Sequence, residues 1–122
     1  MDLPGNGSEK RVYMDRIPVR AGRRLTLVRA EEIDWIEAAA NYVRIHAGGE
    51  AHVLREKISA IEAELDPLTF VRIHRSRIVN VEKIRGLETI SRGARVIVLQ
   101  DGTRLRLSRG QRGKLPVLTR TG

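Results

Sequence analysis

The sequence predicts a mainly β fold with one clear short helix at about residues 56–65. Short runs of alternating apolar and polar residues recur along the chain, which is the pattern of half-buried strands. Turn sequences that contain glycine separate several of these runs. Apolar residues recur with convincing helical spacing in a single segment. Together these patterns indicate many short strands and little helix.

The length of the chain allows one domain. With 122 residues it is long enough to bury a single core. Residues 1–15 mix proline, glycine and charged residues, so we predict a linker or disordered leader there and a domain over residues 16–122. The sequence has neither an apolar run approaching the ~20 residues of a membrane span nor the apolar segment of a secretory signal. It has no cysteine, which fits a reducing compartment, so we expect a cytoplasmic protein without membrane contact.

The first predicted strands lie near the N-terminal end of the domain. Alternating runs within residues 17–28 flank Ala21 and Gly22 and predict two strands joined by a turn. Residues 30–32 are too short for a full helix and are predicted to form one turn. A strand that enters the core is then expected to begin at Ile33.

Turn dipeptides mark two later hairpins. Gly48 and Gly49 separate the first pair of runs, and Asp101 and Gly102 separate the second. The second dipeptide favours a type I′ turn, in which both positions need a positive φ. The predicted strands are 42–46 and 51–54 in the first hairpin, and 95–100 and 103–108 in the second. A further strand is predicted near 84–90, followed by a turn at 91–93.

The predicted helix carries its apolar residues at positions i, i+3 and i+7. These are Ile58, Ile61 and Leu65, and the proline two residues later ends the helix. Its charged face is expected to be solvated. Between Glu56 and Glu64 it has one basic and three acidic residues, so we exclude it as a DNA-recognition helix. A short C-terminal helix is a second prediction, over residues 109–118.

Basic charge gathers in the second half of the chain. The net charge is +8, but residues 1–66 hold 10 Lys and Arg against 12 Asp and Glu, whereas residues 67–122 hold 13 against 3. Such asymmetry is typical of proteins that bind a polyanion such as nucleic acid. An arginine-rich background composition is the alternative explanation, and along the last predicted strand Arg104 and Arg106 are expected to be a solvated sheet face.

The stretch at residues 70–80, FVRIHRSRIVN, concentrates polar groups between two apolar runs. His74, Arg75, Ser76 and Arg77 follow one another there. Guanidinium groups suit bidentate recognition of phosphate or of a guanine edge. A solvated turn between two strands is the simpler alternative, with Ser76 and His74 as a hydrogen-bonded pair. Asn80 is expected to be a turn residue.

Enzyme, cofactor and metal chemistry find no support. A two-residue turn at Gly48 and Gly49 would point His46 and His52 to opposite faces, whereas a three-residue loop would align them. We do not expect a metal site there. A phosphate-binding loop is excluded because the only Gly-Lys pair is followed by Leu115. We therefore expect a binding protein with no cofactor.

Duplex DNA is the nucleic acid that fits the composition best. Single-strand binding uses aromatic stacking platforms, but the chain has just four aromatic residues. Of these, Trp35 and Phe70 lie in apolar runs and are predicted to be core. Arginines in loops can read duplex DNA without aromatic residues. An RNA-binding module and a basic protein-interaction domain are the alternatives.

Separated motifs in one order resemble a known family. They are IDWIEA at 33–38, NYV at 41–43, FVRIHRS at 70–76, VN at 79–80 and LSR at 107–109. Over about residues 17 to 118 the chain resembles the LytTR-type DNA-binding domain of bacterial response regulators. The resemblance implies an elongated sandwich of small antiparallel β-sheets with little helix. Their loops would enter successive major grooves of duplex DNA, often at paired direct repeats, to regulate transcription.

The resemblance also implies roles for individual residues. Arg75, Arg109 and the loop at Asn41 would read bases. The phosphate-contacting or supporting residues would be His74, Ser76, Arg77, Tyr42, Arg112 and Lys114. The alternative for His74 is a hydrogen bond to a backbone carbonyl instead of a phosphate contact. Ala39 and Ala40 occupy a loop where the family commonly has polar residues or glycine.

The family domain usually follows a receiver domain, and none lies within the 122 residues. We therefore expect either a fragment of a two-component response regulator or a stand-alone regulator. A receiver or sensor domain N-terminal in the full-length protein, and a dimer on DNA, are further expectations from the resemblance.

Overall fold

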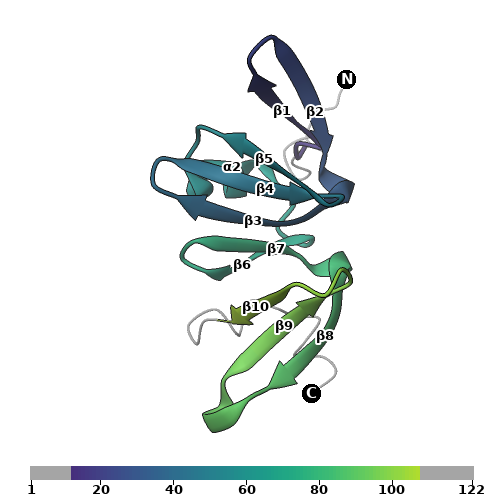
Figure 1. The fold of residues 1–122 in the computed structure, drawn as a ribbon, viewed down its shortest axis with the longest axis vertical. Coiled ribbons are helices and arrows are strands. Elements are labelled where there is room, and N and C mark those ends of the chain that lie inside the picture. The colour runs from purple at the N-terminus through teal and green to yellow at the C-terminus, as the bar shows by residue number, and fades with distance from the viewer. Residues whose placement is uncertain (1–11, 108–122) are drawn as a thin grey trace, which may run out of the picture.

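The computed structural model describes residues 12–107 of the chain, whose strands form three antiparallel sheets (Figure 1). Figure 1 shows these sheets stacked along the long axis of the molecule, with the five-stranded sheet in the middle. Within the described residues α2 is the single α-helix, beside three short 3-10 turns. The predicted elongated, mainly β fold with small antiparallel sheets is therefore confirmed.

The strand order of each sheet defines the topology. The N-terminal sheet pairs β1 (Arg16–Ala21) with β2 (Arg24–Arg29). The central sheet has the order β5-β4-β3-β7-β6, and the C-terminal sheet has the order β10-β9-β8. The central strands are β3 (Ile33–Ala39), β4 (Tyr42–Ala47), β5 (Glu50–Leu54), β6 (Phe70–His74) and β7 (Arg77–Asn80). The C-terminal strands are β8 (Ile84–Thr89), β9 (Arg95–Leu99) and β10 (Arg104–Leu107).

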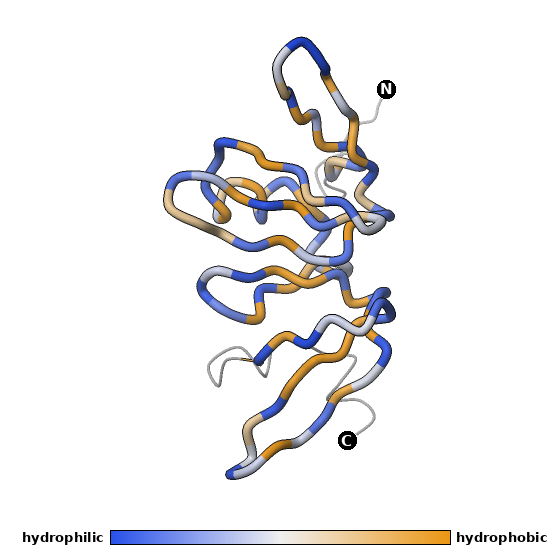
Figure 2. The backbone as a smooth tube through the Cα atoms, viewed as in Figure 1, coloured by the Kyte–Doolittle hydropathy of each residue, from blue (hydrophilic) through white to orange (hydrophobic). Residues whose placement is uncertain are grey.

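The central sheet has a hydrophobic core on each face. Ile36, Ile45 and Ile78 lie directly opposite one another on β3, β4 and β7, and each is fully buried in the first core. Successive residues of a strand point to opposite faces. Val79 accordingly belongs to the second core, which β10 completes with Leu105. Figure 2 shows hydrophobic residues along the strands and hydrophilic residues at the β1–β2 and β6–β7 turns.

The helix α2 (Ile58–Glu64) packs against the first core with the apolar residues that predicted it. Ile58, Ile61 and Leu65 are buried there. The helix is shorter than the predicted 56–65 because Lys57 and Leu65 have extended backbone dihedrals, with ψ of 145° and 152°. The predicted helix is thus confirmed with tighter bounds.

The turn between β4 and β5 has two residues, one of the two loop lengths that the sequence left open. Ala47 pairs with Glu50, and Gly48 and Gly49 have φ of 58° and 84°. A two-residue loop with positive φ at both positions is the type I′ turn that matches the twist of a hairpin. His46 consequently pairs with Ala51, as the two-residue turn requires.

The predicted type I′ turn between β9 and β10 is wrong. Of its two residues Gly102 alone has a positive φ, 94°. The Gly102 N–H donates to the Leu99 carbonyl at 2.9 Å, and the Leu99 N–H donates to the Thr103 carbonyl at 2.8 Å. The loop therefore has three residues and ends in a left-handed glycine, a common alternative hairpin geometry. The Asp101 carboxylate accepts from the Thr103 N–H at 2.9 Å, which stabilises this longer turn.

Two of the predicted core and turn residues lie where expected, and one differs. Phe70 is buried in the first core, as predicted. Trp35 is half-buried at the edge of the second core, and its ring stacks on His46 with centroids 4.2 Å apart. The prediction that Trp35 belongs to the core is thus confirmed in part, because the residue packs against the second core without being fully buried. Asn80 is the predicted turn residue: its side chain accepts from the Glu82 N–H at the start of a 3-10 turn.

Several predictions lie wholly or partly outside the described residues. The predicted C-terminal helix at 109–118 is one of them, and so is most of the predicted linker at 1–15. In the part of the chain that the structure describes, no helix has the length and apolar character needed to cross a membrane.

Candidate nucleic-acid interface

Two turns lie side by side at the same end of the strands of the central sheet. Ala40 and Asn41 join β3 to β4, and Arg75 and Ser76 join β6 to β7. Because β3 pairs with β7, segments far apart in sequence meet here, and the Ala38 N–H donates to the Ser76 carbonyl at 2.8 Å. Figure 1 shows both turns on the same side of the molecule. The fold therefore brings together the predicted residues Asn41 and Arg75, both of which are exposed.

The interior of the β6–β7 turn is fixed by His74 and Ser76. The Ser76 N–H donates to His74 Nδ1 at 3.1 Å, and the Ser76 hydroxyl lies 2.9 Å from the same nitrogen. The predicted hydrogen-bonded pair is thus confirmed. Since Nδ1 accepts the backbone N–H, the ring hydrogen is on Nε2.

His74 is neutral near pH 7. Burial lowers its pKa from the ordinary value of 6.5, and the nearby positive charges of Arg77, Arg75 and Arg72 lower the pKa further. The ring therefore carries one N–H donor, on Nε2, and adds no positive charge beside the three neighbouring arginines.

Arg75 presents its guanidinium at the tip of this turn. The residue is exposed, and no group among the described residues forms a hydrogen bond or ion pair with its side chain. Five N–H donors in a planar fork are thus available to a ligand. Arg77, one residue after the turn, is half-buried and lies opposite Glu37 on β3.

Tyr42 and Arg44 support the edge beside these turns. The Arg44 guanidinium lies over the Tyr42 ring, 5.9 Å from its centroid. Arg44 Nη1 also lies 3.5 Å from the Glu37 carboxylate, which accepts a second contact from His46 Nε2 at 2.9 Å. Tyr42 therefore has a cation–π partner within the fold.

The β3–β4 turn has an unusual backbone. Ala40 has φ of 52°, a region that L-residues other than glycine rarely adopt because Cβ approaches the following carbonyl. The sequence showed only that alanine replaces the family's polar or glycine residues, and gave no sign of this conformation.

The third predicted contact region begins beyond β10. That strand ends at Leu107 on the same side of the molecule as the two turns (Figure 1). The predicted residues Arg109, Arg112 and Lys114 follow it in the chain and lie outside the described residues. Along β10 itself, Arg104 and Arg106 are exposed as predicted, and Arg104 pairs with Glu88 at 2.6 Å.

Sequence reasoning missed a pair of residues behind the β6–β7 turn. The charged face of α2 was expected to be solvated, but the Glu62 carboxylate accepts from Arg72 Nη1 at 2.6 Å. Arg72 also donates to the carbonyl groups of His74 and Arg75. A signal was available in retrospect: Arg72 interrupts an apolar run on a strand whose neighbours are buried.

The same residues offer no metal site. Within residues 12–107 no group of three His, Asp or Glu side chains converges on a position that could hold a metal ion.

The β fold with two adjoining turns, of which the β6–β7 turn bears Arg75, is the fold of a solved LytTr DNA-binding domain. The LytTr DNA-binding domain of a Bacillus cereus protein superposes with a TM-score of 0.77 and 19% identity, covering 87% of this chain and 97% of that one. The sequence of residues 23–118 matches the LytTr DNA-binding domain family. The chain belongs to the LytTR family, as the resemblance implied. It is therefore a DNA-binding domain of the kind found in transcriptional regulators.

Curated relatives are similar over most of this chain. The sensory transduction protein LytT of Enterococcus faecalis is 25% identical over 107 residues, which are 88% of this chain and 44% of that protein. The transcriptional regulatory protein LytR of Staphylococcus aureus is 24% identical, over 76% of this chain and 38% of that protein. The CO-responsive transcriptional regulator RcoM of Rhodospirillum rubrum is 26% identical, over 70% and 36%. The chain spans less than half the length of these relatives.

Proposed function

We propose that this domain binds duplex DNA in a sequence-specific manner and thereby controls transcription. Arg75, Arg109 and Asn41 are the base-reading residues of this proposal. The residues that contact the DNA backbone or support the base-reading residues are His74, Ser76, Arg77, Tyr42, Arg112 and Lys114.

The observation that carries the proposal is the state of Arg75. Its guanidinium is exposed and unbonded within the described residues, while the turn that carries it is bonded on both sides. The backbone of a preordered turn loses little conformational freedom on binding, so the ordering cost falls mainly on the Arg75 side chain. The planar fork matches the O6 and N7 acceptors of guanine in the major groove, the commonest specific protein–DNA contact.

The neighbouring groups suit contacts to phosphate, which fix position without reading sequence. His74 carries its N–H on Nε2 and is uncharged, so it can donate one hydrogen bond to a phosphate oxygen. Arg77 adds positive charge beside the turn. Asn41, in the adjoining turn, offers an amide that can pair with an adenine edge.

In the full-length protein we propose a receiver or sensor domain N-terminal to this domain, and a dimer on DNA. The relatives are more than twice as long as the segment they share with this chain, which leaves room for such a domain. A dimer would place Arg75 from each copy at paired direct repeats, with Arg109 of each copy in a successive major groove.

Selection from a pool of random duplex DNA at physiological salt tests the proposal. We expect enrichment of two short repeats about one helical turn apart. With Arg75→Ala, particular positions of the motif should become degenerate, at a cost on the order of 1–3 kcal/mol for the matched site.

Arg104→Ala is the matched control. It also removes one exposed arginine, but Arg104 is paired with Glu88 on the C-terminal sheet, so the motif should not change. If no motif is recovered and binding disappears as salt rises, the domain is a non-specific polyanion surface and the proposal fails. Tighter binding to RNA of equal length would also refute it.

A further inference from the structure

We infer that Glu62 and Arg72 are positioning residues for sequence recognition: they hold the backbone of the β6–β7 turn from behind and so aim Arg75, an inference that rests on the proposed function. Neither residue faces DNA in this arrangement. Their effect on specificity would pass entirely through the turn.

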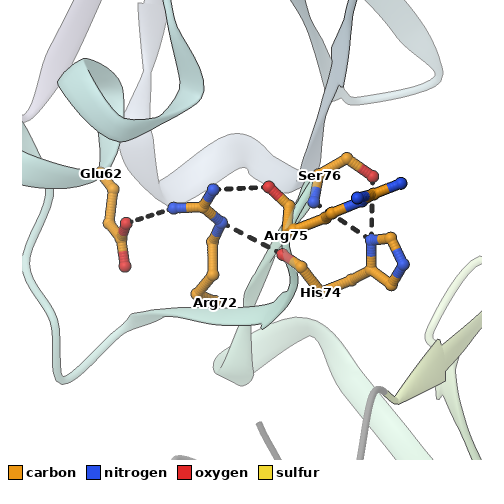
Figure 3. Close-up of polar contacts among 5 residues, drawn as sticks. All are labelled: Glu62, Arg72, His74, Arg75 and Ser76. Carbon is orange, nitrogen blue, oxygen red and sulfur yellow. Dashed lines mark hydrogen bonds and ion pairs between the residues drawn. The ribbon is translucent and has the colours of Figure 1, made fainter. Parts of the chain in front are cut away.

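The geometry of Arg72 is the first argument (Figure 3). Its Nε donates to the His74 carbonyl at 3.1 Å, and its Nη2 donates to the Arg75 carbonyl at 2.5 Å. One planar guanidinium thus holds two successive peptide groups, those that precede and follow the Cα atom of Arg75. Fixing both peptides fixes the direction of the Cα–Cβ bond from which the Arg75 side chain extends.

The placement of Arg72 is the second argument. It lies opposite Ile78 on β7, so it points to the face of the central sheet that α2 covers. Its side chain is 18% exposed. A guanidinium that is removed from water and bonded to two carbonyl groups needs a compensating anion.

Glu62 supplies that anion from a different element. Its Oε1 accepts from Arg72 Nη1 at 2.6 Å, a short charge-assisted hydrogen bond. The helix that carries Glu62 is anchored by Ile58 and Ile61 in the first core. The chain of contacts therefore runs from a packed helix through Glu62 and Arg72 to the peptides that flank Arg75.

Lysine could not replace Arg72 in this role. An ammonium is a point charge and cannot hold one carboxylate and two carbonyl groups in a single plane. Arg72→Lys therefore separates the geometry of the side chain from its charge, because a purely electrostatic contribution to DNA affinity would survive this replacement.

The test measures the ratio of dissociation constants for a scrambled and a selected duplex, at a temperature where every variant is folded. Glu62→Ala should lower this ratio about tenfold, within the range of coupling between contacting residues. Glu62→Gln keeps an acceptor oxygen at the same position and should recover part of the ratio. Arg72→Lys, which keeps the charge, should lower the ratio as Glu62→Ala does.

Glu64→Ala is the matched control. It removes the same charge from the same helix two residues away, at an exposed position, so it should leave the ratio unchanged. Any general gain in affinity from a lost negative charge should be equal in the two alanine variants.

The same measurements in an Arg75→Ala background complete the test. If Glu62 acts through Arg75, Glu62→Ala has no further effect on the ratio there. Suppose that Arg75→Ala lowers the ratio. If Glu62→Ala then leaves the ratio unchanged, or lowers it equally with and without Arg75, the positioning inference is overturned and the proposed function stands. If Arg75→Ala itself leaves the ratio unchanged, the assignment of the base-reading residue fails and the inference falls with it.

Discussion

Replacing Asn80 with alanine should strongly destabilise the fold without changing the discrimination between DNA sequences. Asn80 is 2% exposed and lies where β7 passes into a 3-10 turn. Its Nδ2 donates to the Ile33 carbonyl at 2.9 Å, and its Oδ1 accepts from the Glu82 N–H at 2.9 Å. One side chain therefore ties the start of β3 to the turn that leads to the C-terminal sheet.

The magnitude follows from these two bonds. Loss of an N-cap side chain costs about 0.5–2 kcal/mol. Leaving a buried carbonyl without its partner costs about 1–3 kcal/mol. We expect Asn80→Ala to lower the free energy of unfolding by about 2–4 kcal/mol, which for a domain of this size shifts the melting temperature by roughly 10–25 °C.

Chemical denaturation followed by circular dichroism measures this loss, with Asn41→Ala as the matched control. Asn41 is also a turn asparagine, but it is exposed, so its replacement should change stability by less than about 0.5 kcal/mol. At a temperature where Asn80→Ala is folded, its ratio of affinities for scrambled and selected duplex should equal that of the unmodified chain. A loss of less than 1 kcal/mol, or a changed ratio, would refute the structural role.

Three further perturbations test other features. Ala40→Gly should stabilise the domain by about 0.5–1 kcal/mol in chemical denaturation, because glycine adopts a φ of 52° without the Cβ clash; a destabilised variant would contradict this. Lowering the pH below about 6.5 should reduce stability through His74. The pKa of His74 is lowered in the folded state, so the unfolded chain takes up the proton first. The stability that neutral His74 contributes is therefore present above its ordinary pKa and is lost as the pH falls towards its pKa in the folded state. His74→Gln should therefore flatten denaturation midpoints measured between pH 7 and pH 5, and an unchanged slope would exclude His74 as the cause. Arg77→Ala should weaken binding to all duplexes alike and reduce the slope of log K against log salt by about 1, whereas a selective loss for the target would make Arg77 a base reader.

Local chemistry explains what the sequence alone could predict. Gly48 and Gly49 can adopt positive φ at two successive positions, so their hairpin was predictable, whereas its register depended on a loop length of two or three residues. The spacing of Ile58, Ile61 and Leu65 is likewise a local pattern, and it predicted the helix. In both cases the residues that carry the signal are neighbours along the chain.

Two kinds of feature escaped prediction: a local pattern that fits two geometries, and a contact between distant segments. Asp-Gly is compatible with hairpin loops of two or three residues, so the pattern could not exclude the three-residue loop at Gly102. The ion pair of Glu62 and Arg72 joins a helix to a strand across the first core, and periodicity places each residue without pairing them.

The candidate site shows the same division. The exposed position of Arg75 and the bond between His74 and Ser76 could be predicted from the polar run itself. The meeting of this turn with Asn41 could not, because it follows from the pairing of β3 with β7, and no local pattern specifies which strands of a sheet become neighbours.

That pairing also sets a length scale for recognition. The β3–β4 and β6–β7 hairpins are adjacent in the central sheet, so their turns lie about two strand spacings, or roughly 10 Å, apart. This is less than the ~12 Å width of a major groove and far less than the ~34 Å between successive major grooves. Under the proposed function, Asn41 and Arg75 would therefore read a few adjoining base pairs together, and a contact one helical turn away would come from another part of the chain or from a second copy.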